Sequence, residues 1–142
     1  MDRTYRVDID CPATTVFNYV TDPNNIPSWA WYIEEVRIEP PGPVEVGTEI
    51  HQTVRGREAA WRVTVYEPFE RCVYEFDYWY AAGSVTYLVE DLGARSRFTI
   101  HDHARRSGAM RLLGPILDVV DAHYRRVQLE IVKETLEAGG LE

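Results

Sequence analysis

Three side chains of the sequence could together carry out acid/base chemistry. Asp102 ends the inward row of the last predicted strand, and Tyr87 lies in the inward row of the strand before it. His123 lies about two turns into a predicted helix, beside Val120 and Val127. A histidine can take or return a proton at neutral pH, and a phenol can donate a hydrogen bond to a developing enolate. We therefore predict that Asp102, His123 and Tyr87 form a catalytic set.

A structural role for the same three residues is the alternative interpretation. Asp102 can cap the loop before the helix, His123 can bond a backbone carbonyl, and the hydroxyl of Tyr87 can reach the cavity mouth. Both interpretations stay open at the level of the sequence.

A larger set of side chains is predicted to line a pocket for a small molecule. These residues are mostly aromatic or aliphatic, and they lie on faces that the apolar pattern turns inward. Apolar walls with a few convergent polar groups are typical of small-molecule sites, and aromatic walls suit a flat ligand. The predicted substrate-binding residues are Trp29, Gln52, Trp61, Tyr74, Phe76, Tyr78, Phe98, Ile100, Val120, Tyr124 and Val127. For Trp29 the alternative is a packing role in the fold.

The histidines and cysteines give no clear pattern of a metal or redox site. His51, His101 and His103 invite a metal interpretation, but the face shared by the last two is predicted to point outward, without a third ligand of clear spacing. Cys11 and Cys72 lack CxxC spacing, so we expect two reduced thiols. The sequence also lacks a glycine-rich phosphate loop and a Gly-x-Ser-x-Gly elbow. We predict no metal and no cofactor.

A long C-terminal helix has to position these groups. The spacing of apolar residues predicts a helix over 115–138, with Pro115 in its first turn and Gly139 just after its end. At ~1.5 Å per residue this helix is about 36 Å long, enough to cross a small domain. Its predicted core-facing residues are Ile116, Leu117, Val119, Val120, Val127, Leu129, Ile131, Val132 and Leu136.

The rest of the chain is predicted to form a sheet that wraps this helix. Alternation predicts a first strand over 3–10, followed by two short helices that begin at Pro12 and Asn24. Six further strands are predicted over 33–39, 47–56, 59–67, 71–80, 83–92 and 95–104, which indicates an antiparallel meander. The inward rows are predicted to include Ile50, Gln52, Val54, Trp61, Val63, Val65, Cys72, Tyr74, Phe76, Tyr78, Val85, Tyr87, Val89, Phe98, Ile100 and Asp102.

Length and charge restrict the class of protein. A chain of 142 residues is most simply one domain, 1–142, which buries about two thirds of its unfolded surface. The net charge of -8 argues against nucleic acid and anionic membranes as partners. No apolar run approaches the ~20 residues that span a bilayer, and no signal-peptide pattern follows Met1. We therefore expect a cytoplasmic protein without membrane insertion.

The predicted order of one strand, two small helices, six strands and one long helix is the helix-grip arrangement of an α+β protein. It resembles the START-like (SRPBCC, Bet v 1-like) superfamily. The resemblance rests on VDIDCPATTVFNYVTDPNNIPSW near the N-terminus, on VTVYEPFERCVYEF and GARSRFTI in the sheet, and on the terminal helix. It implies a curved antiparallel sheet of about seven strands wrapped around that helix.

Within this superfamily the chain is similar to the polyketide cyclase/dehydrase family. The resemblance implies a bacterial enzyme that binds an apolar intermediate in a central cavity and promotes cyclisation or dehydration by cofactor-free acid/base catalysis. Aromatase/cyclase members carry an arginine about where this chain has Tyr66, so aromatisation of a first ring is not implied. The alternative is a non-catalytic protein, a carrier or a sequestering resistance protein, for a lipid or natural product. Either would be a monomer or a homodimer with an apolar or polyaromatic ligand.

Overall fold

Seven strands form one antiparallel sheet in the computed structural model, which describes residues 2–78 and 81–139. The strands are β1 (Asp2–Ile9), β2 (Glu35–Glu39), β3 (Glu49–Val54), β4 (Arg57–Glu67), β5 (Arg71–Asp77), β6 (Ala81–Asp91) and β7 (Ser96–Arg106). Their order is β1-β7-β6-β5-β4-β3-β2, so the first strand pairs with the last and β2 forms the other edge. Trp79 and Tyr80, predicted as the end of a strand, lie outside the described residues.

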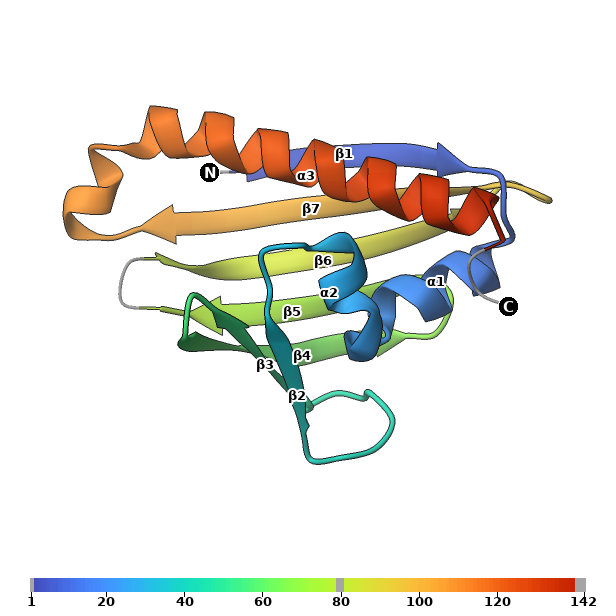
Figure 1. Cartoon of the computed structure of the whole chain (residues 1–142), viewed down its shortest axis with the longest axis horizontal. Helices are drawn as coiled ribbons and strands as arrows, with labels where there is room; N and C mark the ends of the chain where they lie inside the picture. The colour runs from blue at the N-terminus through green and yellow to red at the C-terminus, as the bar shows by residue number, and fades with distance from the viewer. Residues whose placement is uncertain (1, 79–80, 140–142) are drawn as a thin grey trace.

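The helices lie against this sheet. They are α1 (Ala13–Thr21), α2 (Ile26–Trp29) and α3 (Gly114–Glu137), with short 3-10 turns η1 (Pro23–Asn25) and η2 (Gly108–Arg111). Figure 1 shows α3 running along β1 and β7, with α1 and α2 over the middle strands. The predicted helix-grip arrangement is therefore confirmed. Within 2–78 and 81–139, no helix is long and apolar enough to cross a membrane.

Aromatic rings fill much of the space between the sheet and the helices. Ring centroids lie 5.5 Å apart for Trp61 and Tyr74, 5.0 Å for Tyr74 and Tyr87, and 5.5 Å for Tyr87 and Phe98. Trp29 closes this series with an edge-on contact to Tyr87 at 6.0 Å. All of these residues except Trp61 are almost completely buried. The centre of the predicted cavity is thus packed core.

A β-bulge changes the phase of β4. The register between β4 and β5 shifts between Val63 and Val65. Beyond the shift, Tyr66 pairs with Cys72 on the inward side, and its ring packs edge-on against Phe17 at 5.7 Å. The predicted inward position of Val65 is therefore wrong, because one extra residue exchanges the two faces of a strand.

The N-terminal half of α3 turns a different face to the sheet than predicted. Leu129, Val132 and Leu136 are buried as expected, but Ile116 is 65% exposed and Val119 is 71% exposed. The buried residues of α3 are Ala122, Gln128, Leu129, Val132 and Leu136. In the N-terminal half, charged side chains rather than apolar ones face β7, as the next subsection describes.

Gly83 of β6 lies where the backbone of β7 comes very close. A Cβ at Gly83 would overlap the carbonyl oxygen of His103 and would lie 2.7 Å from the Cα of Ala104. Both are backbone atoms of the paired strand, so they cannot move without opening the ladder. We expect Gly83→Ala to lower the free energy of unfolding by about 1–3 kcal/mol or more, measured by urea denaturation.

Gly114 supplies the matched control. At this first residue of α3, the nearest atom to an added Cβ is Nη1 of Arg106 at 3.9 Å, which is an ordinary contact. Gly114→Ala should therefore be neutral or stabilise the protein by up to about 1 kcal/mol, because it reduces the freedom of the unfolded chain. Equal losses in the two variants would contradict the close approach at Gly83.

Candidate functional site

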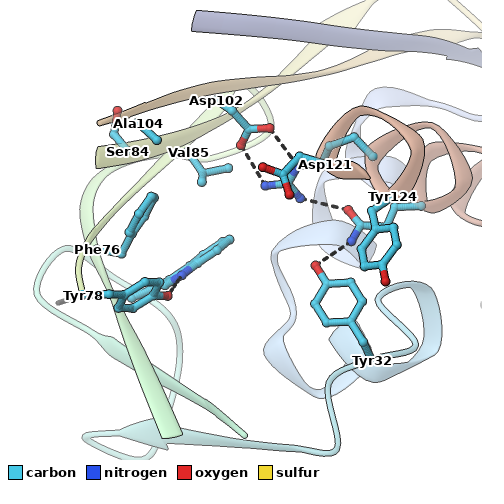
Figure 2. Close-up of a pocket in the computed structure, with 12 residues that line it drawn as sticks. Tyr32, Phe76, Tyr78, Ser84, Val85, Asp102, Ala104, Asp121 and Tyr124 are labelled. Atoms are coloured by element: carbon cyan, nitrogen blue, oxygen red, sulfur yellow. Dashed lines mark hydrogen bonds and ion pairs between the residues drawn. The ribbon is translucent and has the colours of Figure 1, made fainter. Parts of the chain in front are cut away.

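A pocket of about 170 Å³ lies between α3 and the sheet. Figure 2 shows Phe76 and Tyr78 on one side and Tyr32 and Tyr124 on the other, with Asp102 between the two groups. The complete lining is Tyr32, Trp61, Phe76, Tyr78, Ser84, Val85, Asp102, Ala104, Asp121, Tyr124, Arg125 and Gln128. Aromatic walls thus enclose a charged centre.

A larger groove of about 900 Å³ adjoins this pocket. The two share Tyr32, Trp61 and Tyr78 as lining residues, and Gln52 lies in the groove. Sites for drug-sized ligands typically enclose about 300–1,000 Å³. The pocket alone is therefore large enough for one end of such a ligand, and the groove could hold the remainder.

An ion pair between α3 and β7 forms the charged centre of the pocket. Arg125 donates from Nε to Oδ2 of Asp102 at 2.9 Å and from Nη2 to Oδ1 at 2.8 Å. The side chains of Arg125 and Asp102 are only 12% and 13% exposed. Burial disfavours the charged guanidinium, but the charge and hydrogen bonds of Asp102 outweigh it, and the pKa of Arg125 is raised. Arg125 is therefore a fixed cation.

Two further hydrogen bonds connect this ion pair to Tyr32 in the loop after α2. Arg125 donates from Nη1 to Oε1 of Gln128 at 2.9 Å, and Nε2 of Gln128 donates to the hydroxyl of Tyr32 at 2.9 Å. Gln128 is 1% exposed, so its amide needs both partners. These hydrogen bonds hold Tyr32 where the pocket and the groove meet.

A second arginine binds two carboxylates on the same face of α3. Arg106 at the end of β7 donates to Asp118 at 2.6 Å and to Asp121 at 2.8 Å. Only Asp121 lines the pocket. Partial burial raises the pKa of Asp121, and the charges of Arg106 and Arg125 offset part of this rise. Asp121 is consequently a better proton acceptor than an ordinary aspartate.

The aromatic walls are held by ring contacts. On the sheet side, Trp61 donates from Nε1 to the hydroxyl of Tyr78, and Phe76 stacks on Tyr78 with centroids 4.9 Å apart. On the helix side, the centroids of Tyr32 and Tyr124 lie 5.4 Å apart. Two flat surfaces therefore flank the charged centre.

The structure separates the predicted site residues into three groups. Those in the pocket or groove are Gln52, Trp61, Phe76, Tyr78, Asp102 and Tyr124. Those packed in the core are Trp29, Tyr74, Tyr87, Phe98 and Ile100, none of which lines the pocket or the groove. Those elsewhere on α3 are Val120, His123 and Val127.

The predicted pocket shared by Asp102, His123 and Tyr87 needs correction. His123 is exposed on α3 and lies outside the pocket lining. Tyr87 is 3% exposed within the aromatic core, where burial raises the pKa of its hydroxyl. Val120 is also exposed and Val127 is half-buried, because α3 presents a different face from the one predicted. Only Asp102 of the three reaches the pocket, and it is paired with Arg125.

Five polar residues of the pocket were not among the predicted site residues: Tyr32, Ser84, Asp121, Arg125 and Gln128. The three on α3 carried a signal, because positions 121, 125 and 128 continue in helical phase to the buried Val132. A search for apolar residues alone misses a helix face that is polar in its N-terminal half and apolar in its C-terminal half.

The buried ion pair generates a stability prediction. Asp102→Asn removes the charge that compensates Arg125, and breaking a buried pair in this way typically costs ~3–5 kcal/mol. The double variant Asp102→Leu/Arg125→Met removes both charges and is expected to recover most of the loss, as measured by urea denaturation. Asp8→Asn, in the more exposed pair with Arg97, is the control and should change the midpoint little. An additive double variant would contradict this account.

Several solved structures share the fold. The di-domain ARO/CYC BexL from the BE-7585A biosynthetic pathway matches with a TM-score of 0.79 at 20% identity, covering 100% of this chain and 48% of that one. The present chain therefore spans about half the length of BexL. A START superfamily protein from Mycobacterium smegmatis matches with a TM-score of 0.69 at 15% identity, covering 95% of this chain and 98% of that one.

A plant enzyme has the same fold at lower identity. Norcoclaurine synthase from Thalictrum flavum, in complex with dopamine and hydroxybenzaldehyde, matches with a TM-score of 0.70 at 10% identity, covering 96% of this chain and 86% of that one. At such identities a structural match shows the fold alone. No curated protein matches the chain significantly. The family described as polyketide cyclase / dehydrase and lipid transport matches residues 2–137, so the chain belongs to this family.

Proposed function

We propose that the protein is a polyketide cyclase/dehydratase-like enzyme that acts on an apolar intermediate by cofactor-free acid/base catalysis. The observation that carries the proposal is the pocket itself, in which a fixed guanidinium and a carboxylate lie between aromatic walls. Membership of the polyketide cyclase / dehydrase and lipid transport family supports the same class of reaction.

Arg125 is the proposed stabiliser of negative charge. A guanidinium has five N–H donors, and its bonds to Asp102 and Gln128 use three of them. The other two have no partner among the described residues and are available to a carbonyl oxygen. Because the guanidinium is held before the ligand arrives, it can stabilise an enolate oxygen without reorganising. Asp102 then acts as a positioning residue.

Asp121 is the proposed base. Its carboxylate lines the same pocket, and its raised pKa brings it closer to that of a carbon acid activated by a neighbouring carbonyl. Proton removal by Asp121 beside Arg125 would give an enolate. The enolate carbon could then attack a second carbonyl, whose oxygen takes the proton held by Asp121, or the enolate could expel a β-hydroxyl group, which leaves as water with that proton. Either outcome is a step of cyclisation or dehydration.

The shape of the site indicates what kind of ligand it would take. The pocket holds one end, while the larger adjoining groove combines the apolar side chains of Val54, Ala59 and Trp61 with the charged side chains of Arg55, Arg57, Glu58 and Asp77. A flat or chain-like molecule with a carbonyl at one end fits this arrangement. Such a ligand would remain partly exposed to solvent.

A non-catalytic binding protein is the second candidate. The charges of the pocket are already compensated within the protein, since Arg125 pairs with Asp102 and Arg106 pairs with Asp121. The ion pair with Arg106 also occupies the carboxylate of Asp121 and offsets part of the rise in its pKa. This observation favours binding without turnover, as in a carrier or a sequestering protein.

Ligand binding is tested by quenching of tryptophan fluorescence with alizarin, a flat hydroxylated anthraquinone. We expect saturable quenching, because Trp61 lines both the pocket and the groove. Trp61→Phe should remove most of the quenching. Trp29→Phe is the control, since Trp29 is 1% exposed in the core and should contribute little. Unchanged quenching in Trp61→Phe would place the site elsewhere.

Catalysis is tested separately by deuterium exchange of benzoylacetone, followed by NMR. We expect the protein to accelerate exchange, with a rate that rises with pH through the raised pKa of Asp121, because only the carboxylate form accepts a proton. Asp121→Asn should lower the rate by ~100-fold and remove this rise.

Asp118→Asn is the matched control for this experiment. Asp118 binds the same arginine, Arg106, from the same helix, but it does not line the pocket. It should retain most of the activity. If alizarin binds but Asp121→Asn leaves the exchange rate unchanged, the binding-protein candidate replaces the enzyme.

A further inference from the structure

Two glutamates face each other on β2, the edge strand of the sheet, and on its neighbour β3. Glu39 of β2 and Glu49 of β3 are direct cross-strand partners. Like charges in this position destabilise a strand pair unless a cation lies between them. Arg37 and Arg62 bind one oxygen of each carboxylate, and the second oxygen of each lies near His51.

His51 presents a buried nitrogen to both carboxylates. Its Nε2 atom lies 3.4 Å from Oε2 of Glu39 and 3.3 Å from Oε1 of Glu49. The side chain is only 14% exposed, and Nε2 is buried without a hydrogen-bond partner among the described residues. A buried polar atom in this state needs a partner that protein atoms do not supply.

A third carboxylate fixes which nitrogen carries the proton. Nδ1 of His51 lies 2.9 Å from Oε1 of Glu58 on β4. An ionised carboxylate only accepts hydrogen bonds, so Nδ1 is the donor and the lone pair of neutral His51 is on Nε2. That lone pair points at two anionic oxygens. A histidine whose other nitrogen donates to a carboxylate is the usual arrangement around a metal ligand.

An arginine binds each of the carboxylates of Glu39 and Glu49 and fixes its orientation. Arg37 binds Oε1 of Glu39, and Arg62 binds Oε2 of Glu49 at 3.3 Å. The remaining oxygen of each carboxylate is the one that faces Nε2 of His51. These contacts leave one oxygen from each glutamate directed at a common point.

We propose that Glu39, Glu49 and His51 bind a divalent first-row transition ion, with Glu58 as the partner that holds the imidazole. Zinc bonds to nitrogen and oxygen are about 2.0–2.2 Å long, so tetrahedral ligands lie about 3.3–3.6 Å apart. The separations of 3.3 and 3.4 Å at Nε2 match this spacing. The candidate ligand atoms all lie within 4.8 Å of one another. Glu39 is half-exposed, which leaves room for water as a fourth ligand.

The donor set also indicates which ions are excluded. An imidazole with two carboxylates suits zinc and its neighbours, whereas calcium and magnesium prefer oxygen ligands alone. The bound ion would tie the edge strand β2 to β3. The three ligands do not line the pocket, although Glu58, which orients His51, lines the adjoining groove.

Isothermal titration of the purified, metal-stripped protein with zinc chloride tests the proposal. We expect one equivalent to bind, and we expect His51→Gln to weaken binding at least tenfold. Glu58→Gln should weaken it ~10–100-fold, because the orienting carboxylate is lost. His101→Gln is the matched control, since His101 also lies near a carboxylate, Asp2, on an outward strand face. It should leave binding unchanged.

Three results would overturn the proposal. They are the absence of saturable binding at ~1 mM zinc, equal weakening by His51→Gln and His101→Gln, and competition by magnesium at concentrations similar to zinc. Alizarin quenching and benzoylacetone exchange do not involve this site, so failure here leaves the proposed function untouched.

Discussion

The charge of Arg125 has to be compensated, because a guanidinium buried between a helix and a sheet loses its hydration. Asp102 provides the compensation through two hydrogen bonds, and this contact fixes how α3 is rotated above β7. The hydrogen bonds of Gln128 and Tyr32 depend on this contact, because the remaining polar atoms on that face of the helix need partners as well. The rotation that satisfies these groups leaves Ile116 and Val119 in solvent. One ion pair thus determines which face of the helix meets the sheet.

The same rotation determines where a ligand could bind. Trp29, Tyr74 and Tyr87 pack against one another in the middle of the sheet, so the space there is filled. The pocket lies instead beside Arg125, between the aromatic side chains of the sheet and those of Tyr32 and Tyr124. The family gives the fold, and the chemistry has to come from such local arrangements. In this chain the candidate groups Asp102, Asp121 and Arg125 lie between α3 and β7.

The strands and their inward rows could be predicted from alternation, because one side chain in two must be buried when one face of a sheet is covered. The long helix could be predicted from the helical spacing of its apolar residues, because one of its faces must also be buried. The pairing of Asp102 with Arg125 could not, since the two residues belong to separate elements and no local pattern links them. The bulge after Val63 was equally hidden, because it changes the phase without changing the composition. His51 was noticed, but Glu39 reaches it only through the register of β2 and β3.

Helix α3 is attached to the sheet in two different ways along its length. Leu129, Val132 and Leu136 anchor its C-terminal half by apolar burial, whereas Asp118, Asp121 and Arg125 anchor its N-terminal half by charge. Salt screens partly exposed charges. Salts of strongly hydrated ions also favour the burial of apolar side chains. Rising ionic strength therefore acts in opposite directions on the two halves of one helix. Within the N-terminal half, the contact of Arg106 with the half-exposed Asp121 is screened more than the buried pair of Arg125 with Asp102, so salt loosens the pocket at Asp121 before it affects Arg125.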